Sequence, residues 1–446
     1  MGGLAAAGVN VLLIAILAHR LSPESFSIWN LSLQMMVYIN ILTIGLQTAT
    51  ARCVADANQV DEMRLPVIVH AARSIARLAS CVAVLAVLLL VVLYPIMFPS
   101  IPVEMVDDFR IVLTLFGLAS VTQIMSQVEM GVFQGLHRNA VFVGVQILVR
   151  ILTVLAVWIA VELKQSIIVL AASMAAATAS LFPAIRMVFM RALPWSSCVA
   201  QVVLDLCCRR ELLSYCGSLS VWSVCMLLVN SVGIILVGRW DYNMTGAYAI
   251  AMTGATVLAG LVGAVMSPLL TTTAALYSNK KTRLQLPALL IHSTLSVSVS
   301  LNLLALFVVV THAWIVRLWV GESFVMSAGP LLIILVGAHC LRNIGAPYAL
   351  MLLATGLHKR ALVSAVFEGF ATLVASIIFG SQWGAMGVAF GSLVGSVIGI
   401  VGVFAMNAHR TPELTPQPKR IAFGSALLPT LIFSPLHYAA LTKIMI

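Results

Sequence analysis

The sequence predicts an all-α polytopic membrane protein of about 12 transmembrane helices, arranged as two six-helix parallel repeats around a central cavity. Composition is the first reason. Hydrophobic residues make up 61% of the 446-residue chain and charged residues only 9%, whereas a soluble domain carries about 25% charged residues. The other two reasons are the spacing of the apolar runs and an internal repeat.

The apolar runs form two sets of six, each long enough to cross a hydrocarbon core of about 30 Å. The first set covers about 4–18, 26–48, 76–98, 110–128, 140–161 and 166–190, and the second covers about 212–237, 245–270, 286–311, 324–345, 361–380 and 385–405. We therefore expect an N-terminal bundle at 1–190, a cytoplasmic linker at 191–211, a C-terminal bundle at 212–410 and a tail at 411–446. The apolar stretch 421–442 of the tail predicts an extra or re-entrant membrane segment.

Two short segments occur once in each half. Gly135-Leu136-His137-Arg138 recurs as Gly356-Leu357-His358-Lys359, and Ile16-Leu17-Ala18-His19-Arg20 resembles Ile235-Leu236-Val237-Gly238-Arg239. The two offsets, 221 and 219 residues, nearly agree and indicate a duplication. Six spans per half is an even number, so both halves enter the membrane from the same side and the repeat axis should follow the membrane normal. This architecture is typical of transporters.

The net charge of +10 is distributed between loops in a way that predicts orientation. Alternate loops carry 17 basic residues, and the intervening loops carry five: Arg20, Arg110, Lys164, Arg239 and Arg317. The richer set is Arg52, Arg64, Arg73, Arg77, Arg138, Arg186, Arg191, Arg209, Arg210, Lys280, Lys281, Arg283, Lys359, Arg360, Arg410, Lys419 and Arg420. Because basic loops stay inside, this set and the N-terminus should be cytoplasmic. The charge therefore indicates membrane topology, and no nucleic-acid partner.

Arginines within or beside the spans are the first candidates for a binding site. Arg150 lies in the middle of the fifth span, Arg342 towards the inner end of the tenth, and Arg52 and Arg239 follow the second and seventh. Guanidinium groups lining a cavity suit a phosphate or diphosphate, since each planar fork can pair two oxygens. The alternative is that these side chains extend to lipid headgroups.

Two deep carboxylates, Glu129 and Glu368, are candidates for ion coupling. Ionisable groups at membrane depth are costly and often bind a transported or coupling ion, here H⁺ or Na⁺. Each could equally neutralise an arginine across its bundle, and the sequence leaves both interpretations open. No metal-ligand spacing and no other cofactor motif emerges.

Uncharged polar residues form stripes at helical spacing. Asn30, Gln34 and Tyr38 recur every four residues in the second span, as do Gln123 and Gln127 in the fourth. They predict cavity-lining faces that bind substrate, with hydrogen bonding between helices as the alternative. The small residues of 384–399 predict close helix packing.

Catalytic patterns are missing from the sequence. It has no G-x-x-x-x-G-K-[ST] phosphate loop, no Ser/His/Asp constellation, and no outward loop long enough for glycosyl transfer. A membrane polysaccharide polymerase or ligase, the alternative from a different class, would need such a loop. We therefore expect a transporter and no enzyme.

Several ordered motifs resemble those of polysaccharide flippases of the Wzx type, which belong to the multidrug/oligosaccharidyl-lipid/polysaccharide exporter superfamily. They are Leu21-Ser22-Pro23-Glu24-Ser25-Phe26-Ser27-Ile28-Trp29, Ile44-Gly45-Leu46-Gln47-Thr48-Ala49, Leu318-Trp319-Val320-Gly321, Ala354-Thr355-Gly356-Leu357-His358-Lys359 and Trp383-Gly384-Ala385-Met386-Gly387-Val388-Ala389. Ser22 and Ser27 stand where the family commonly has glycine.

The resemblance implies a secondary transporter that flips a polyprenyl-diphosphate-linked oligosaccharide from the inner to the outer leaflet by alternating access. It also implies a bacterial cytoplasmic (inner) membrane location, with membrane lipids and other polysaccharide assembly proteins as partners. An ion-coupled drug or organic-cation antiporter of the same superfamily is the alternative. That alternative would need a carboxylate-lined, aromatic cavity, whereas an anionic lipid carrier would need arginines.

Overall fold

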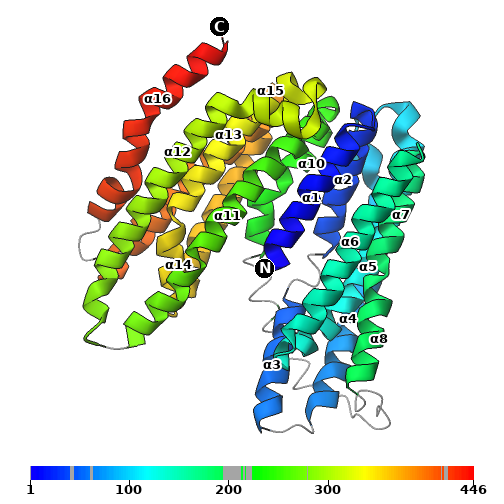
Figure 1. Cartoon of the computed structure of the whole chain (residues 1–446), viewed down its shortest axis with the longest axis horizontal. Helices are drawn as coiled ribbons and strands as arrows, with labels where there is room; N and C mark the ends of the chain where they lie inside the picture. The colour runs from blue at the N-terminus through cyan, green and yellow to red at the C-terminus, as the bar shows by residue number, and fades with distance from the viewer. Residues whose placement is uncertain are drawn as a thin grey trace. The chain divides into compact units, whose positions relative to one another are not determined.

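The computed structural model describes residues 2–40, 45–60, 64–193, 212–213, 216, 223–278, 280–412, 414–415 and 420–445. Over these residues every regular element is a helix (Figure 1). The contacts divide the chain into two compact units, Met1–Val224 and Cys225–Ile446. The linker expected at 191–211 lies outside the described residues from 194 onward.

The N-terminal unit consists of helices that follow the expected order of spans. They are α1 (Gly2–Ala18), α2 (Pro23–Ile39), α3 (Leu46–Val60), α4 (Leu65–Met97), α5 (Val106–Gly135), α6 (Asn139–Glu162), α7 (Ile167–Ala179) and α8 (Leu181–Ala192). Within this unit α5 packs against α2, α3, α4 and α7, so it is the central helix. Helix α6 packs mainly against α1 and α7.

Local sequence sets the helix ends. Ser22 caps α2, because its Oγ accepts the backbone N–H of Ser25 at 3.2 Å, and Pro23 occupies the first turn. Gly45 precedes α3 with a φ of 95°, a conformation that favours glycine. The second expected span, 26–48, therefore corresponds to α2, and α3 begins only at its end.

The C-terminal unit contains the second set of spans. It comprises the helix Ser223–Asn230, α10 (Val232–Trp240), α11 (Thr245–Ser278), α12 (Leu286–Val320), α13 (Val325–Ile344), α14 (Ala346–Ala354), α15 (His358–Asn407), the π-helix η9 (Arg420–Leu427) and α16 (Leu428–Met445). Helix α13 packs against α11, α12 and α15, so it is the central helix of this unit.

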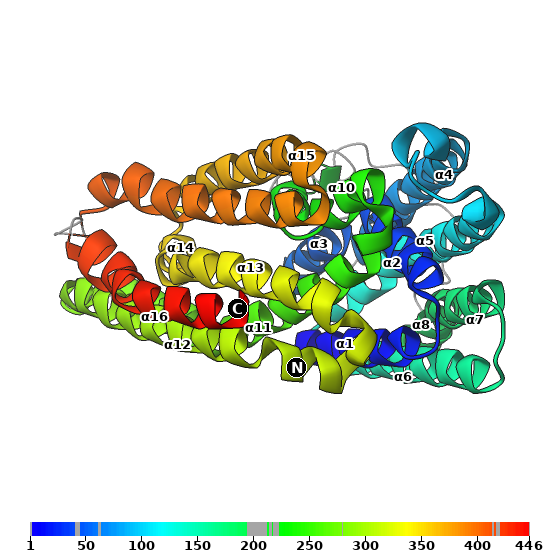
Figure 2. The ribbon, with the colours of Figure 1, turned by 90° about the horizontal axis from the view of Figure 1, so that it is seen from above.

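Helix α15 is a hairpin of two helices. The backbone leaves helical geometry at Trp383 and Gly384, where Gly384 has a φ of 56°, and the two runs lie side by side (Figure 2). Glycines recur every four residues in the second run, and each faces a different part of the first run. A Cβ added at Gly391 would collide with Ser376, at Gly395 with Thr372, and at Gly399 with Glu368. The small face expected from 384–399 thus brings the two runs together and places Glu368.

The chain is a polytopic membrane protein. Among the described residues, eight helices are long and apolar enough to cross a membrane, or nine if the bent pair Ser223–Asn230 and Val232–Trp240 is one span. That count treats the α15 hairpin as one helix, and it leaves out α1 and α2. With these included, the helices match the expected positions of about 12 spans.

The third span differs from the expected one at its start. Helix α4 begins at Leu65 rather than near residue 76 and has 33 residues, a length of about 50 Å. Arg73 and Arg77 therefore lie on a helix, although the sequence placed them in a loop. Arg186 likewise lies within α8. The error arises because a helix that continues beyond the bilayer loses its apolar signal there.

Both segments of the internal repeat occupy matching places in the order of helices. The first pair lies at the end of α1 and at the end of α10, the second helix of the bent pair that begins the second set. The second pair forms the turn from α5 to α6 and the turn from α14 to α15. A two-fold axis between the halves stays a prediction.

The tail contributes a further helix to the C-terminal unit. Helix α16 packs against α12 (Figures 1 and 2), and Asn302 of α12 donates a hydrogen bond to Thr430 Oγ1 at 3.1 Å. Ser298 donates to the backbone oxygen of Ala426 at 2.8 Å. The apolar stretch 421–442 is thus helical, although α16 is not among the eight candidate spans.

Candidate functional site

A polar cavity of about 320 Å³ lies inside the N-terminal unit. Helices α1, α5, α6, α7 and α8 contribute to its wall. Its lining residues are Val9, Asn10, Leu13, Gln123, Ser126, Gln127, Met130, Gln146, Val149, Arg150, Thr153, Met174, Thr178 and Leu181. The sequence-predicted residues Arg150 and Gln127 are therefore brought together in one cavity.

Helical spacing explains why two stripes face this space. The α5 residues at 123, 126, 127 and 130 and the α6 residues at 146, 149, 150 and 153 share the same pattern of three, four and seven residues. Residues at this spacing lie on one face of a helix. The Gln123 and Gln127 stripe seen in the sequence is thus continued by Ser126 and Met130. Gln146, one turn before Arg150, extends the second stripe.

The hydrogen bonds around the cavity determine what its amides can offer a ligand. Asn40, which follows the last residue of α2, donates to Gln123 Oε1 at 3.0 Å, and this leaves the NH₂ group of Gln123 available to donate. The Gln146 amide donates to the sulfur of Met130 at 3.0 Å, and a thioether is a weak acceptor. A ligand oxygen could replace that sulfur at little cost.

The only formal charge in the cavity lining is positive. Arg150 is the only ionisable residue among the fourteen that line the cavity, and none of the fourteen is aromatic. A guanidinium surrounded by amide and hydroxyl groups suits an anion that carries further oxygens. The same lining lacks the carboxylates and rings that attract an organic cation.

Glu129 lies on α5 and is paired with two arginines. The side chain is only 2% exposed, and its Oε1 accepts from Arg186 Nη1 of α8 at 2.9 Å and from Arg73 Nε of α4 at 3.3 Å. Both guanidinium groups lie over the Phe189 ring, at 5.1 and 5.9 Å from its centroid. The cluster has one carboxylate and two arginines, so its formal charge is +1.

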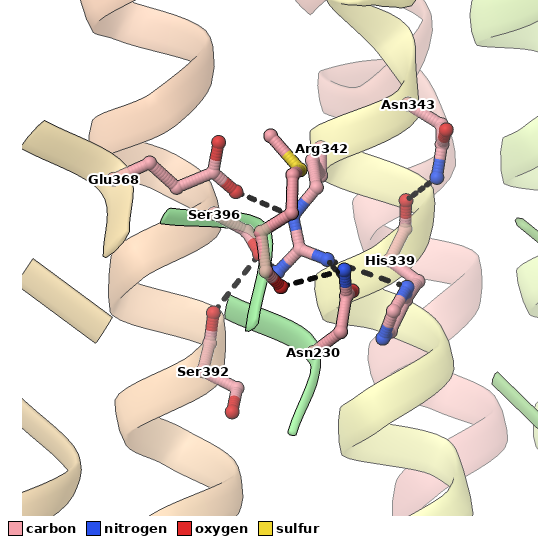
Figure 3. Close-up of polar contacts among 8 residues, drawn as sticks. Asn230, His339, Arg342, Asn343, Glu368, Ser392 and Ser396 are labelled. Atoms are coloured by element: carbon pink, nitrogen blue, oxygen red, sulfur yellow. Dashed lines mark hydrogen bonds and ion pairs between the residues drawn. The ribbon is translucent and has the colours of Figure 1, made fainter. Parts of the chain in front are cut away.

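Glu368 is paired with an arginine in the C-terminal unit (Figure 3). Arg342 of α13 donates through Nε to Glu368 Oε1, through Nη1 to Asn230 Oδ1 at 3.0 Å, and through Nη2 to Ser396 Oγ at 3.3 Å. The Nη1 atom also lies 3.4 Å from His339 Nδ1, one turn earlier on α13. We call these five residues the Arg342 cluster. It joins the helix Ser223–Asn230, α13 and both runs of α15.

The remaining predicted residues lie outside the cavity lining. Arg52 is exposed on α3, with its Nε 3.9 Å from Asp56 Oδ2, and Arg239 is exposed near the end of α10. Asn30 and Gln34 are buried on α2. Asn30 donates to the backbone oxygen of Phe26 at 2.7 Å, and the Gln34 Nε2 atom has no hydrogen-bond partner.

Sequence reasoning missed the residues that complete both clusters. Arg73 and Arg186 were assigned to loops, and Asn230 and Ser396 were not considered. Ser396 could have been found, because it stands in the glycine-rich stretch opposite the deep Glu368. Asn230 carried no signal, since a single amide in an apolar span has many structural uses.

Known proteins share this fold and part of this sequence. The family model described as polysaccharide biosynthesis protein matches residues 1–274, more than half of the chain. A search of curated proteins finds no significant sequence match. Among solved structures, the lipid II flippase MurJ in an inward closed conformation has a TM-score of 0.72 at 12% identity, with 98% of both chains covered.

Two further structures extend the comparison. An inward-facing multidrug resistance MATE family transporter of the MOP superfamily has a TM-score of 0.70 at 15% identity, covering 98% of this chain and 95% of its own. A eukaryotic MATE transporter has a TM-score of 0.60 at 12% identity, covering 96% of each chain. The resemblance seen in the sequence motifs is confirmed. The chain belongs to the polysaccharide biosynthesis protein family, and it has the fold of the flippases and multidrug transporters of the MOP superfamily.

Proposed function

We propose that this protein flips a polyprenyl-diphosphate-linked oligosaccharide across a bacterial cytoplasmic membrane, and that the cavity around Arg150 binds the diphosphate. The observation that carries the proposal is the arginine in an amide-lined cavity inside a membrane unit. An arginine at membrane depth is costly to bury, so its position there calls for a function. Membership of the polysaccharide biosynthesis family and the likeness to a lipid II flippase support the same class of substrate.

We assign a role to the polar side chains of the lining. The guanidinium of Arg150 pairs with phosphate oxygens, and the NH₂ groups of Gln123 and Gln127 donate to the remaining oxygens of the diphosphate or its first sugar. A volume of about 320 Å³ is at the lower end for small-molecule sites. We therefore assign the cavity to the diphosphate and its neighbouring sugar, and place the rest of the glycan and the lipid outside it.

An ion-coupled antiporter of organic cations is the second candidate, because multidrug transporters share the fold. The cavity disfavours it, since the guanidinium of Arg150 repels a cation and none of the lining residues is aromatic. Arg52 is exposed on α3 and Arg239 is exposed near the end of α10. We assign both a supporting role in attracting the anionic headgroup.

Binding of a synthetic polyprenyl diphosphate to the purified protein tests the proposal. Arg150→Ala should weaken binding about 10- to 100-fold, the effect of losing one charge-assisted hydrogen-bonding group. Arg150→Lys should weaken it less, because it keeps the charge and loses the fork. Polyprenol without phosphates should not distinguish the variants.

Arg110 offers a matched control within the same unit. Its guanidinium lies 4.9 Å from the Tyr94 ring centroid and 3.7 Å from Asp107, and it does not line the cavity. Arg110→Ala should bind polyprenyl diphosphate as the unmodified protein does. Equal loss in Arg110→Ala and Arg150→Ala would show a nonspecific charge effect and would contradict the assignment.

A further inference from the structure

We propose that Glu368, Asn230 and Ser396 form a cation site in the C-terminal unit whose permanent occupant is the guanidinium of Arg342, so that Glu368 exchanges no coupling ion. This inference concerns the other unit and does not depend on the proposed substrate. It decides between the two interpretations that the sequence left open for Glu368. The inference rests on the geometry of the Arg342 cluster (Figure 3).

Three oxygens converge on the guanidinium from separate helical segments. They are Glu368 Oε1 in the first run of α15, Asn230 Oδ1 on the helix Ser223–Asn230, and Ser396 Oγ in the second run of α15. Small hard cations prefer such oxygen ligands. Each of the three Arg342 nitrogens already donates to one of these oxygens. The cation that occupies this position is therefore the guanidinium of a side chain of the protein itself.

Neighbouring contacts hold the oxygens in this orientation. The Asn230 Nδ2 atom donates to the backbone oxygen of Met226 at 2.9 Å, which turns its Oδ1 toward Arg342. The Ser396 hydroxyl donates to the backbone oxygen of Ser392 at 2.9 Å, leaving its lone pairs for the guanidinium. A Cβ on Gly399 would lie 2.6 Å from the Glu368 carboxyl carbon, so glycine there gives the carboxylate its space. The site is therefore built around the charge that it holds.

The charges in the cluster balance only while Arg342 is present. The side chains of Arg342 and Glu368 are 14% and 9% exposed, and the other members are neutral when His339 accepts from Arg342. Removing the guanidinium leaves a carboxylate with no counter-charge in a buried place, which must then take up a cation or a proton. A variant without Arg342 should therefore bind a small external cation.

Binding of ²²Na⁺ and thermal stability of the full-length purified protein test this inference. The unmodified protein should bind no ²²Na⁺ at the cluster and should melt at the same temperature in NaCl and in choline chloride. Arg342→Ser should bind about one Na⁺ per chain, with a melting temperature that rises with Na⁺ or with millimolar guanidinium, as ligand linkage requires. Arg342→Ser combined with Glu368→Gln should lose both responses.

A second arginine in the same unit provides the control. Arg317 pairs with Glu322, but the two side chains are 58% and 68% exposed, so Arg317→Ser should gain no bound ion. Na⁺ binding by the unmodified protein that Glu368→Gln abolishes would overturn the proposal, and this arm remains informative if Arg342→Ser does not fold. A folded Arg342→Ser protein that ignores both Na⁺ and guanidinium would also overturn it, because protonation of Glu368 would then explain the site.

Discussion

The two deep carboxylates, Glu129 and Glu368, show how buried charges are neutralised in this protein. Each was a candidate ion carrier in the sequence, and each is found in contact with arginine, Glu129 with Arg73 and Arg186 and Glu368 with Arg342. Removing one partner of a buried ion pair leaves the other charge without compensation, which costs more than the pair itself contributes. The two carboxylates should therefore matter first for stability.

Glu129→Gln should destabilise the protein by about 3 kcal/mol, because it leaves the partly buried Arg73 and Arg186 unneutralised. Reversible unfolding in mixed detergent measures the change. Glu162→Gln is the control, since Glu162 pairs with Arg20 at 3.4 Å while both are about half exposed, and it should cost less than about 1 kcal/mol. If Glu129→Gln is as stable as Glu162→Gln but loses ion-dependent transport, Glu129 is the ion carrier.

At the scale of residues, the sequence predicted which ionisable residues lie within the spans better than it predicted which residues pair with them. Arg150 and Glu129 could be recognised because an ionisable group in an apolar run is rare. Their partners could not, since pairing joins residues far apart in the chain, such as Glu129 with Arg73 and Arg186. His339 and Arg342 are in contact because they lie one turn apart on α13, a spacing that the sequence already shows.

The hairpin of α15 shows how an element positions a site. Its two runs approach closely because Gly391, Gly395 and Gly399 present no side chain to Ser376, Thr372 and Glu368. The same approach carries Ser396 to Arg342. The energetic contribution of this packing can be tested one glycine at a time.

Gly391→Ala should destabilise the protein by about 1–3 kcal/mol, because the added Cβ would meet the backbone of Ser376, which cannot move independently of its helix. Thermal unfolding measures the effect. Gly402→Ala is the matched control on the same run, since its Cβ would lie 3.8 Å from Ser364, an ordinary contact. It should be neutral or stabilising by up to about 1 kcal/mol through helix propensity. Equal effects at both positions would contradict the packing account.

At the scale of elements, hydropathy predicted which segments are helices, and it failed at their ends. The spans predicted at 140–161 and 245–270 correspond to α6 and α11. The break at Gly384 lies between the spans predicted at 361–380 and 385–405. The break at Gly45 and the early start of α4 at Leu65 were not foreseen. Hydropathy measures contact with lipid, whereas a helix end depends on capping and backbone conformation.

The whole molecule is predicted to have its N-terminus and its basic loops in the cytoplasm. Reporter fusions after residues 60, 205 and 281 should behave as cytoplasmic, and fusions after residues 104 and 164 as external, because 17 basic residues lie in or beside one set of predicted loops and five in or beside the other. A fusion after residue 205 that reports an external location would refute this topology.

We propose that the protein moves a diphosphate-linked glycan lipid and that Arg150 contacts the diphosphate. Flipping of a fluorescent polyprenyl-diphosphate sugar in proteoliposomes tests this directly. The fraction of the fluorescence that an impermeant reductant quenches measures how much lipid has crossed the bilayer. We expect fast flipping by the unmodified protein and by Arg110→Ala. The flipping rate should fall about tenfold or more in Arg150→Ala and should be intermediate in Arg150→Lys. Flipping by Arg150→Ala at the unmodified rate, or no flipping by the folded, unmodified protein, would contradict the claim.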